Sequence, residues 1–510
     1  MFGIVGFGGY VPRLRLKRSA VVEANAWYAP QFAGKARGTR AFANWDEDAI
    51  TLAVAAARDC LGAGPDRSHI RQVVLASTTL PFADRLNAGV VCEALTLGQD
   101  VAAMDVGGSQ RAGLSALLDA FSKVKGGAGD VLVLAADNRK TRAASAQELD
   151  YGDAAAAIQL GTGQVLAELL GSGTLSVDFV DHFRMNGEDI DYHWEERWVR
   201  DEGIAKLMPK AIAAALGQAG VGAAQIDHFI FPSTFAKMDA QLAKSCGIRA
   251  EAVVDGLADK VGDSGVSHSL LLLAQVLERA TKGQLILVSQ FGSGAQALVL
   301  RVTEHIAGFR PQRGVSQWLQ RGAEERNYTK FLSFKEQIRL ERGMRGEQDK
   351  KTALSTAYRH KSAILGLVAG KCSVTGSVHF PPSRLSYDPG VPLLDTQVPY
   401  KLADRGAKVL SWSAETLSFH MAPPHHYGQI DFDGGGRLLM DFTDLDPGEV
   451  QAGTAMELVF RIKDIDELRG FTRYFWKATP LRPVAGQGQS APAVTTGAAA
   501  QGAMATSQSN

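Results

Sequence analysis

The sequence predicts a large α/β region followed by an all-β barrel, and three observations support this fold class. In residues 1–303, short apolar segments alternate with longer segments whose apolar residues recur at helical spacing, as in helices packed on sheets. Residues 360–480 instead alternate apolar and polar side chains around a glycine turn, which is typical of antiparallel strands. The first 303 residues also contain a weak internal repeat, so we expect two similar halves.

The elements of the α/β region follow from length and composition. Four short, apolar, β-branched segments are predicted strands: 73–77, 131–136, 229–232 and 285–289. Four segments with helical apolar spacing lie between them and are predicted helices: 50–61, 87–97, 113–124 and 267–280.

The internal repeat pairs two strand–turn–helix–strand units. The segment VGGSQRAGLSALLDAFSKVKGGAGDVLVLAAD is similar to VGDSGVSHSLLLLAQVLERATKGQLILVSQFG, and VVLASTTLPFADRLNAGVVCEALTLG is similar to HFIFPSTFAKMDAQLAKSCGI. Two such halves that share one core would bring their equivalent loops together around a pseudo-twofold axis. We therefore expect a cleft between those loops.

The chain is predicted to contain five segments. Residues 1–165 and 166–303 are the two α/β halves, and the charged segment 304–358 is interpreted as one or two solvated linking helices rather than a partner-binding helix. Residues 359–482 hold a predicted hairpin (429–432 and 438–442 around the turn 433–436) and further strands at 457–462 and 472–477, a barrel candidate. The uncharged tail 483–510 is predicted to be disordered.

Composition excludes several functions. Lys plus Arg and Asp plus Glu both number 54, a neutral balance that argues against nucleic-acid binding and against a basic membrane-surface protein. No apolar stretch is long enough to span a membrane, and the first residues lack the pattern of a signal peptide. Four scattered cysteines do not form a disulfide framework, so we expect a reducing, cytoplasmic environment.

Several motifs resemble those of one enzyme superfamily. Residues 44–49 (NWDEDA), 105–106 (DV), 261–264 (VGDS) and 291–295 (FGSGA) are similar to the thiolase superfamily, in its 3-hydroxy-3-methylglutaryl-CoA synthase and ketoacyl synthase III branch, over residues 1–303. Cys372, the FPP of residues 380–382 and the hairpin at 427–446 resemble the OB-fold domain, usually preceded by a zinc ribbon, that accompanies thiolase-like enzymes of acyl-CoA metabolism. The resemblance implies a duplicated, five-layer αβαβα thiolase fold followed by an OB barrel.

The resemblance also places the family's catalytic residues, and none of them is kept. The nucleophilic cysteine at the start of the helix after the glycine turn corresponds to Gln110, whose carboxamide is not a competent nucleophile. The acid/base glutamate falls at residues 77–79, the histidine at Pro232 and the asparagine at Asp263. An ordinary synthase or ketosynthase mechanism is therefore not expected.

Other groups are candidates for the missing chemistry. Ser109 beside Gln110 could form a couple with His268 of the second half, although a buried, satisfied histidine is the commoner finding at such a position. Residues 181–201 (DHFRMNGEDIDYHWEERWVRD) either line the cleft and supply acid/base groups or form a solvated insertion or dimer contact, the interpretation we favour. Cys92 and Cys246 are interpreted as core residues.

By resemblance, we expect a coenzyme A thioester as substrate or ligand. The positions predicted to bind it are Arg37, Arg40, Thr78, Ser233, Gly292 and Gly294. Cys372 and His379 supply two zinc ligands at most, and a structural site needs four, so neither zinc nor a tightly bound cofactor is expected.

Three functions remain open. The leading hypothesis is an acyltransferase component that is similar to 3-hydroxy-3-methylglutaryl-CoA synthase, forms a homodimer core and binds or channels acyl-CoA for a catalytic thiolase partner. The second is an autonomous carbon–carbon lyase or ligase that acts on CoA thioesters through an unconventional site at Ser109, Gln110, Asp263 and His268. The third is a scaffold without a small-molecule ligand.

Overall fold

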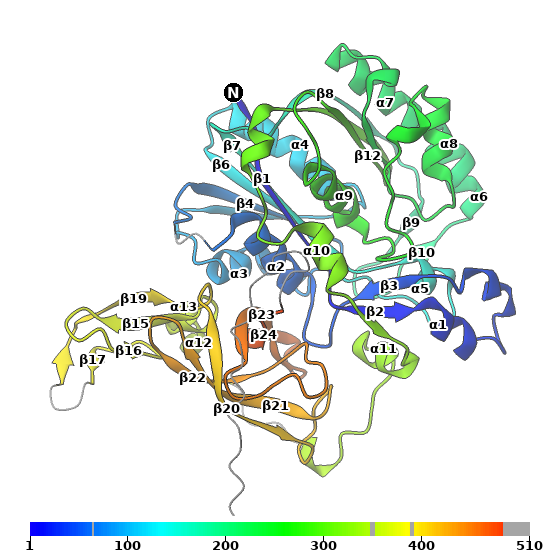
Figure 1. Cartoon of the computed structure of the whole chain (residues 1–510). Helices are drawn as coiled ribbons and strands as arrows, with labels where there is room; N and C mark the ends of the chain where they lie inside the picture. Colours follow the sequence, from blue (N-terminus) through cyan, green and yellow to red (C-terminus); the bar gives the residue numbers. More distant parts are fainter. Residues whose placement is uncertain (64–65, 347–351, 388–391, 483–510) are drawn as a thin grey trace, which may run out of the picture. The chain divides into compact units, whose positions relative to one another are not determined.

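A nine-stranded mixed sheet forms the centre of the α/β region (Figure 1). The computed structural model describes residues 1–63, 66–346, 352–387 and 392–482, so the tail predicted to be disordered lies outside the described residues. The strands run in the order β11-β12-β13-β8-β1-β7-β6-β4-β5. Their bounds in chain order are β1 Phe2–Tyr10, β4 Ile70–Ala76, β5 Ala102–Val106, β6 Asp130–Asp137, β7 Ala154–Thr162, β8 Ala167–Ser176, β11 His228–Ile230, β12 Leu285–Phe291 and β13 Gly294–Val302.

The sheet contains the duplication that the repeat predicts. In the first half, β5, β4 and β6 are parallel to one another, and β7 and β1 follow antiparallel. The second half repeats this order, because Val253 bridges to β11 in parallel, β11 is parallel to β12, and β13 and β8 follow antiparallel. The two halves join where Ile4 of β1 pairs with Ala167 of β8.

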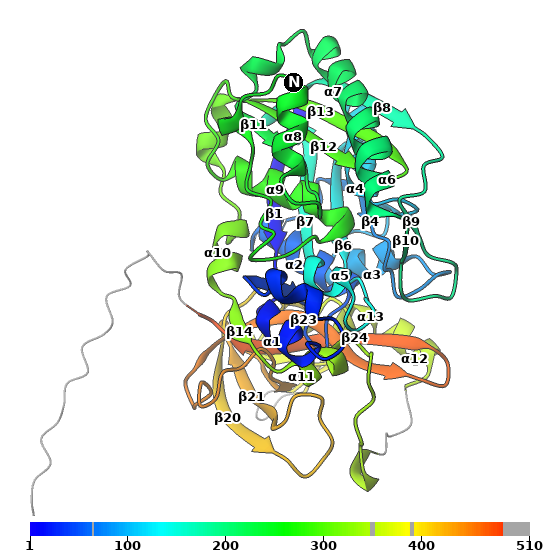
Figure 2. The same cartoon turned by 90° about the vertical axis from the view of Figure 1, so that its right-hand side faces the viewer.

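Helices cover the sheet in layers (Figures 1 and 2). Helices α4 (Ala112–Lys125) and α9 (His268–Leu277) contact each other and strands of both halves, so they form a shared inner layer. Helices α2 (Ala49–Leu61) and α3 (Asn87–Ala94) pack on the outer face of the first half, and α7 (Ala205–Ala219) and α8 (Met238–Ser245) lie on the side of the second. The two outer helix layers, the shared inner helix layer and the two halves of the sheet are the five layers of the predicted αβαβα arrangement.

Residues 314–335 of the charged segment are packed rather than solvated, which corrects the expectation for this part, whereas no residue of α12 (Leu354–Arg359) is buried. Helix α10 (Gly314–Gln320) buries Val315, and helix α11 (Tyr328–Phe334) buries Phe331. Immediately after α11, the ammonium group of Lys335 lies 2.6 Å from the carboxylate of Asp153, and both side chains are buried. Strand β14 (Ala323–Glu325) extends a small sheet with β2 (Leu14–Lys17) and β3 (Thr39–Phe42).

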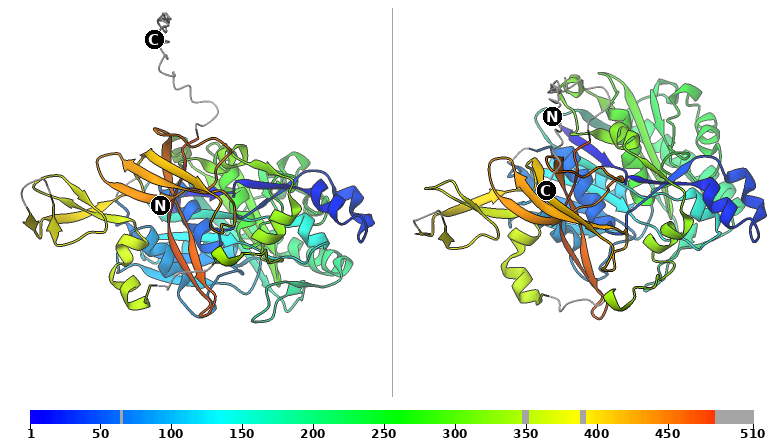
Figure 3. Two further views of the ribbon diagram at one scale, coloured as in Figure 1. Left: turned by 90° about the horizontal axis from the view of Figure 1, so that it is seen from below. Right: turned by 60° about the horizontal axis from the view of Figure 1, so that its bottom comes forward.

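The C-terminal region is all-β after two short helices, α12 (Leu354–Arg359) and α13 (Lys361–Ile364). Its five-stranded sheet has the order β22-β21-β20-β23-β24 and curls on itself (Figure 3), because Phe442 bridges to Ala478 of β24. The predicted hairpin is present as β21 and β22, joined by the glycine turn. The bounds are β20 Ala407–Glu415, β21 His425–Phe432, β22 Arg437–Asp441, β23 Ala455–Asp466 and β24 Phe471–Pro480.

Before this sheet lies the segment that the sequence predicts to be a degenerate, metal-free ribbon. Its strands are β15 Val368–Cys372, β16 Val378–His379, β17 Leu385–Ser386, β18 Leu393–Leu394 and β19 Gln397–Lys401. The thiol of Cys372 lies 3.2 Å from the hydroxyl of Thr396, which in turn lies 3.1 Å from the hydroxyl of Ser386. Within the described ranges, no group of three or more His, Cys, Asp or Glu side chains is arranged to hold a metal ion.

A buried ionic cluster joins the C-terminal sheet to the first half of the α/β region. We use this name for Tyr10, Asp46, Glu47, Asp444, Arg461 and Lys477. The Arg461 guanidinium lies 3.0 Å from Glu47 and 2.8 Å from Asp444, and Lys477 lies 2.8 Å from Asp46. Residues 44–49, one of the motifs that resembles the family, therefore make a structural contact with β23 and β24.

Candidate functional site

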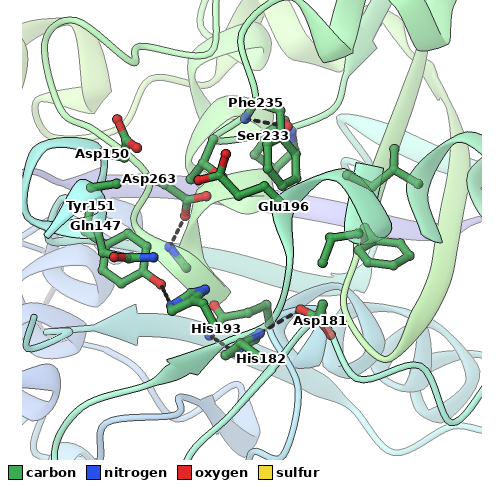
Figure 4. Close-up of a pocket in the computed structure, with 18 of the residues that line it drawn as sticks. Gln147, Asp150, Tyr151, Asp181, His182, His193, Glu196, Ser233, Phe235 and Asp263 are labelled. Carbon is green, nitrogen blue, oxygen red and sulfur yellow. Dashed lines mark hydrogen bonds and ion pairs between the residues drawn. The ribbon is translucent and has the colours of Figure 1, made fainter. Parts of the chain in front are cut away.

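A cavity of about 340 Å³ opens where the equivalent loops of the two halves meet (Figure 4). Gln110 precedes helix α4 in the first half, and Asp263 and Gly265 precede α9 in the second, as the repeat predicts for a cleft. The segment between β8 and α7 closes another side of the cavity. The polar or charged lining residues are Gln110, Arg139, Gln147, Asp150, Tyr151, Asp181, His182, His193, Glu196, Ser233, Thr234, Asp263 and Gln290.

An acid/base dyad, Asp181 and His182, faces the residue in the nucleophile position. Nδ1 of His182 lies 2.6 Å from the carboxylate of Asp181, and Nε2 lies 3.3 Å from the amide nitrogen of Gln110. Because a carboxylate only accepts hydrogen bonds, Nδ1 carries the proton, and Nε2 has a lone pair that accepts from the amide. Burial by itself would raise the pKa of Asp181, but the contact with His182 lowers it below its usual range. This arrangement resembles that of a general base held by a carboxylate.

Gln110 has one polar side-chain atom without a partner in the described part of the chain. Its side-chain oxygen is buried and has no hydrogen-bond partner among the described residues. Gly265, with φ of +63°, passes so close that a Cβ atom there would lie 2.7 Å from that oxygen. The close approach requires glycine at this position.

A second polar pair, Tyr151 and His193, lies beside the dyad. The Tyr151 hydroxyl lies 2.5 Å from Nε2 of His193 and also accepts a hydrogen bond from the guanidinium of Arg139. Since arginine can only donate, the phenol proton faces His193. Burial, together with the nearby Arg139 guanidinium, lowers the pKa of His193 to about 4, so this ring is neutral at neutral pH. The rings of His182 and His193 stack with centroids 5.5 Å apart.

Asp263 supplies an ionised carboxylate to the cavity. One of its oxygens accepts a hydrogen bond from the N–H of Gly265 at 2.7 Å and lies 3.8 Å from the Arg139 guanidinium. Burial alone would raise the pKa of Asp263, but the His268 ring, Arg139 and the Gly265 N–H together lower it to about 2. Asp263 therefore accepts hydrogen bonds and donates none at neutral pH.

The segment that carries both histidines is anchored on both halves. Its short strands β9 (His182–Phe183) and β10 (Tyr192–His193) pair with each other. Asp191 lies 2.9 Å from Arg139 and 2.7 Å from Arg184, and Asp181 accepts a hydrogen bond from the N–H of Ser293 at 3.2 Å. A π-helical turn, Val199–Ile204, then leads into α7, and such turns are frequent at functional sites.

The structure brings only part of the predicted site together. Gln110, Asp263 and Ser233 line the cavity. Ser109 does not, and its hydroxyl donates to the carbonyl of Gly292 at 2.8 Å. His268 binds backbone through both ring nitrogens, accepting from the Ser264 N–H and lying 2.8 Å from the Gly256 carbonyl, as a satisfied buried histidine does.

The other predicted ligand-binding residues also lie outside the cavity lining. Arg40 is fully buried and donates to the carbonyl of Glu148, whereas Arg37 is exposed beside Asp259. Thr78 donates to the carboxylate of Asp137. Gly292 and Gly294 shape the turn between β12 and β13, where Gly294 has φ of +122°. Their assignment to coenzyme A stays a prediction.

Residues 181–201 are the main difference between expectation and structure. We favoured a solvated insertion or a dimer contact, yet Asp181, His182, His193 and Glu196 line the cavity. The alternation of histidines, aromatics and carboxylates was the available signal. Tyr151 and Arg139 were not predicted, because neither residue stands in a recognisable motif.

Comparisons with known proteins agree with the predicted resemblance. Residues 216–302 match the family model "3-Oxoacyl-[acyl-carrier-protein (ACP)] synthase III C terminal", and residues 400–461 match "ChsH2, C-terminal OB-fold domain". The hydroxymethylglutaryl-CoA synthase of Archaeoglobus fulgidus is 29% identical over 348 residues, covering 66% of this chain and 100% of the relative. That of Methanocaldococcus jannaschii is 26% identical over 348 residues, covering 67% and 100%.

Solved structures confirm the fold class. An HMG-CoA synthase complexed with CoA aligns with a TM-score of 0.56 at 18% identity, covering 69% of this chain and 95% of that one. The 3-oxoacyl-(acyl carrier protein) synthase III of Pseudomonas aeruginosa aligns with a TM-score of 0.53 at 20% identity, covering 59% and 98%. The chain thus combines a thiolase-like α/β region, similar to hydroxymethylglutaryl-CoA synthases, with an OB-fold region. Among the described helices, none is long and apolar enough to cross a membrane.

Proposed function

We propose that this chain binds acyl-CoA thioesters in the cavity and makes or breaks a carbon–carbon bond by proton transfer, without a cysteine-bound acyl intermediate. The observation that carries the proposal is the hydrogen-bonded row Asp181, His182 and Gln110 on the cavity wall. Gln110 cannot act as a nucleophile, but the dyad beside it has the composition and tautomer of a general base.

A 3-hydroxyacyl thioester illustrates the step. Nε2 of His182 takes the proton of the 3-hydroxyl, whose oxygen becomes a carbonyl as the bond between C2 and C3 breaks. The electron pair of that bond moves to C2 and forms the thioester enolate, which His182 protonates to give a shorter acyl-CoA. The reverse sequence joins a carbonyl compound to the thioester. Asp181 would stabilise the charged imidazolium in both directions.

Neighbouring groups support this assignment. The Gln110 amide currently donates to His182 over a long 3.3 Å contact, which a substrate hydroxyl could replace. The proton of the Tyr151 phenol faces His193, and a substrate oxygen that gains negative charge would replace that acceptor. None of the three cysteines of the α/β region competes as a nucleophile, because Cys60, Cys92 and Cys246 all lie outside the cavity lining, and burial raises the pKa of each thiol.

The test is turnover of 3-hydroxyacyl-CoA thioesters by the purified chain, with the shorter acyl-CoA and the released carbonyl compound measured by mass spectrometry. We expect the Cys92→Ala and Cys246→Ala variants to keep the activity and His182→Gln to lose it. Loss in either cysteine variant, with the fold intact by circular dichroism, would refute a mechanism without a thiol.

The glutamine in the nucleophile position also supports a second candidate. In this reading, the chain forms a homodimer core, binds or channels acyl-CoA and presents it to a thiolase, with the OB-fold region as part of the assembly. Binding of acetyl-CoA or acetoacetyl-CoA by calorimetry, without release of free CoA until a thiolase from the same genome is added, would favour this candidate. Turnover by the chain alone would exclude it.

A further inference from the structure

The cavity has an unusual balance of charge. Its described lining includes four carboxylates, from Asp150, Asp181, Glu196 and Asp263, and one guanidinium, from Arg139 (Figure 4). Glu196 is exposed at the cavity's edge. Asp150 is bound by Lys35, whose ammonium group lies 2.8 Å away.

The one guanidinium of the lining is already engaged. Arg139 lies 2.9 Å from Asp191 and 3.8 Å from Asp263, and it also donates to the Tyr151 hydroxyl. An additional carboxylate on a ligand would have to displace one of these partners, at the cost of leaving a buried charge without its counter-ion.

The two histidines already make hydrogen bonds in the cavity. The proton on Nδ1 of His182 is donated to Asp181, and Nε2 accepts from Gln110. His193 accepts from Tyr151 and is neutral at neutral pH. The groups that remain for a ligand are hydrogen-bonding ones, including the buried, unpartnered carbonyl of Gln110, whose side chain is only 9% exposed.

We infer that the cavity selects acyl-CoA thioesters whose acyl group is uncharged and carries a hydroxyl or keto oxygen, and that it rejects acyl groups with a free carboxylate. This inference rests on the proposed function and narrows its substrate class. It follows that this site does not form or cleave a 3-hydroxy-3-methylglutaryl group, because that acyl group ends in a carboxylate.

The experiment compares two thioesters of equal length, 3-hydroxybutyryl-CoA and succinyl-CoA, titrated into the full chain by calorimetry at pH 7.5. They share the coenzyme and the four-carbon acyl length, but succinyl-CoA carries a terminal carboxylate in place of the methyl group and has no 3-hydroxyl, so the pair tests both parts of the inference. We expect 3-hydroxybutyryl-CoA to bind at least about tenfold more tightly, equivalent to about 1.4 kcal/mol. Succinyl-CoA binding as tightly as 3-hydroxybutyryl-CoA would overturn the inference and leave the proposed function intact.

Charge variants test the cause of the selection. Asp263→Asn and, separately, Glu196→Gln should reduce the ratio of the dissociation constants of succinyl-CoA and 3-hydroxybutyryl-CoA. Free CoA should bind the variants and the parent chain with equal affinity. Glu196 is exposed, so its variant should fold even where Asp263→Asn does not. An unchanged ratio in a folded Asp263→Asn or Glu196→Gln variant would overturn the electrostatic cause. If neither thioester nor CoA bound the parent chain, the proposed function would fail, and the inference with it.

Discussion

Replacement of Arg461 by methionine tests whether the buried ionic cluster holds the OB-fold region on the α/β region. The Arg461 guanidinium is 1% exposed and lies within 3.6 Å of carboxylates from Asp46, Glu47 and Asp444. Methionine keeps the length of the stem and removes the charge and every donor. The variant therefore leaves acidic groups buried at the junction without the cation that they surround.

The expected loss in the free energy of unfolding depends on the contacts that the acidic groups keep in the variant. Breaking a buried ion pair by removing one partner costs about 3–5 kcal/mol. Asp46 would keep Lys477 at 2.8 Å, and Glu47 would keep the hydroxyl of Tyr10 at 2.5 Å, so the loss should stay within that range rather than multiply by three. Burial already raises the pKa of Glu47 to about 7 against the opposing effect of Arg461. Without Arg461, Glu47 should take up a proton at higher pH, and the variant should be less destabilised at pH 6 than at pH 8.

Urea unfolding followed by tryptophan fluorescence measures this cost, with Arg437→Met as the matched control. Arg437 makes a two-pronged contact with Asp431 at 2.6 and 3.0 Å on the same five-stranded sheet, but its side chain is 55% exposed. The control should lose at most about 1 kcal/mol. If Arg461→Met were equally mild, the cluster would not stabilise the junction and our reasoning would be refuted.

Four further outcomes are expected. Asp181→Asn should lower kcat about 10²–10⁴-fold with little change in KM, measured by steady-state turnover, and a pure KM effect would contradict a role in proton transfer. Tyr151→Phe should cost about 1–3 kcal/mol of stability in urea unfolding, because Arg139 and His193 lose a buried partner. Because the pKa of His193 is lowered to about 4, the folded state binds fewer protons than the unfolded state between about pH 6.5 and 4, so the free energy of unfolding falls as the pH drops through this range. His193→Gln should flatten this part of the plot of unfolding free energy against pH. An unchanged plot would contradict the assignment. Gly265→Ala should destabilise the chain by about 1–3 kcal/mol in thermal unfolding, because φ is +63° and its Cβ would lie 2.5 Å from a carboxylate oxygen of Asp137.

Much of the fold could be predicted because its elements have strong local signals. Helices α4 and α9 are apolar enough to be buried on most sides, and their similar sequences predicted the duplication that the strand order shows. The glycine turn between β21 and β22 likewise allowed the hairpin to be predicted from the sequence. The packing of residues 304–346 was not predicted, because the few apolar residues that anchor this segment, such as Phe331, are outnumbered by charged ones. The sequence also does not show that the charged Lys335 forms an ion pair with the buried Asp153.

The site could be predicted only where the family's motifs carried it. Gln110 and Asp263 were located because each follows a glycine turn that resembles the family's, and both line the cavity. Arg40 shows that residue type alone does not identify a ligand-binding position. It was predicted to bind the coenzyme because it is a cation near the expected site, but its side chain is fully buried and donates to the Glu148 carbonyl. The dyad was harder to predict, because Asp181 and His182 come from an irregular segment whose path depends on long-range contacts with Arg139 and Ser293.

The position of β1 has a consequence for the order in which the protein can form on the ribosome. This strand is made before its main partner, β7 (Ala154–Thr162), which emerges about 7–30 s later at a rate of about 5–20 residues per second. Its last residue, Tyr10, waits longer still, since its hydroxyl meets Arg461, 451 positions away along the chain. Strand β1 must therefore stay shielded from other chains until β7 emerges, and the contact between Tyr10 and Arg461 forms later still.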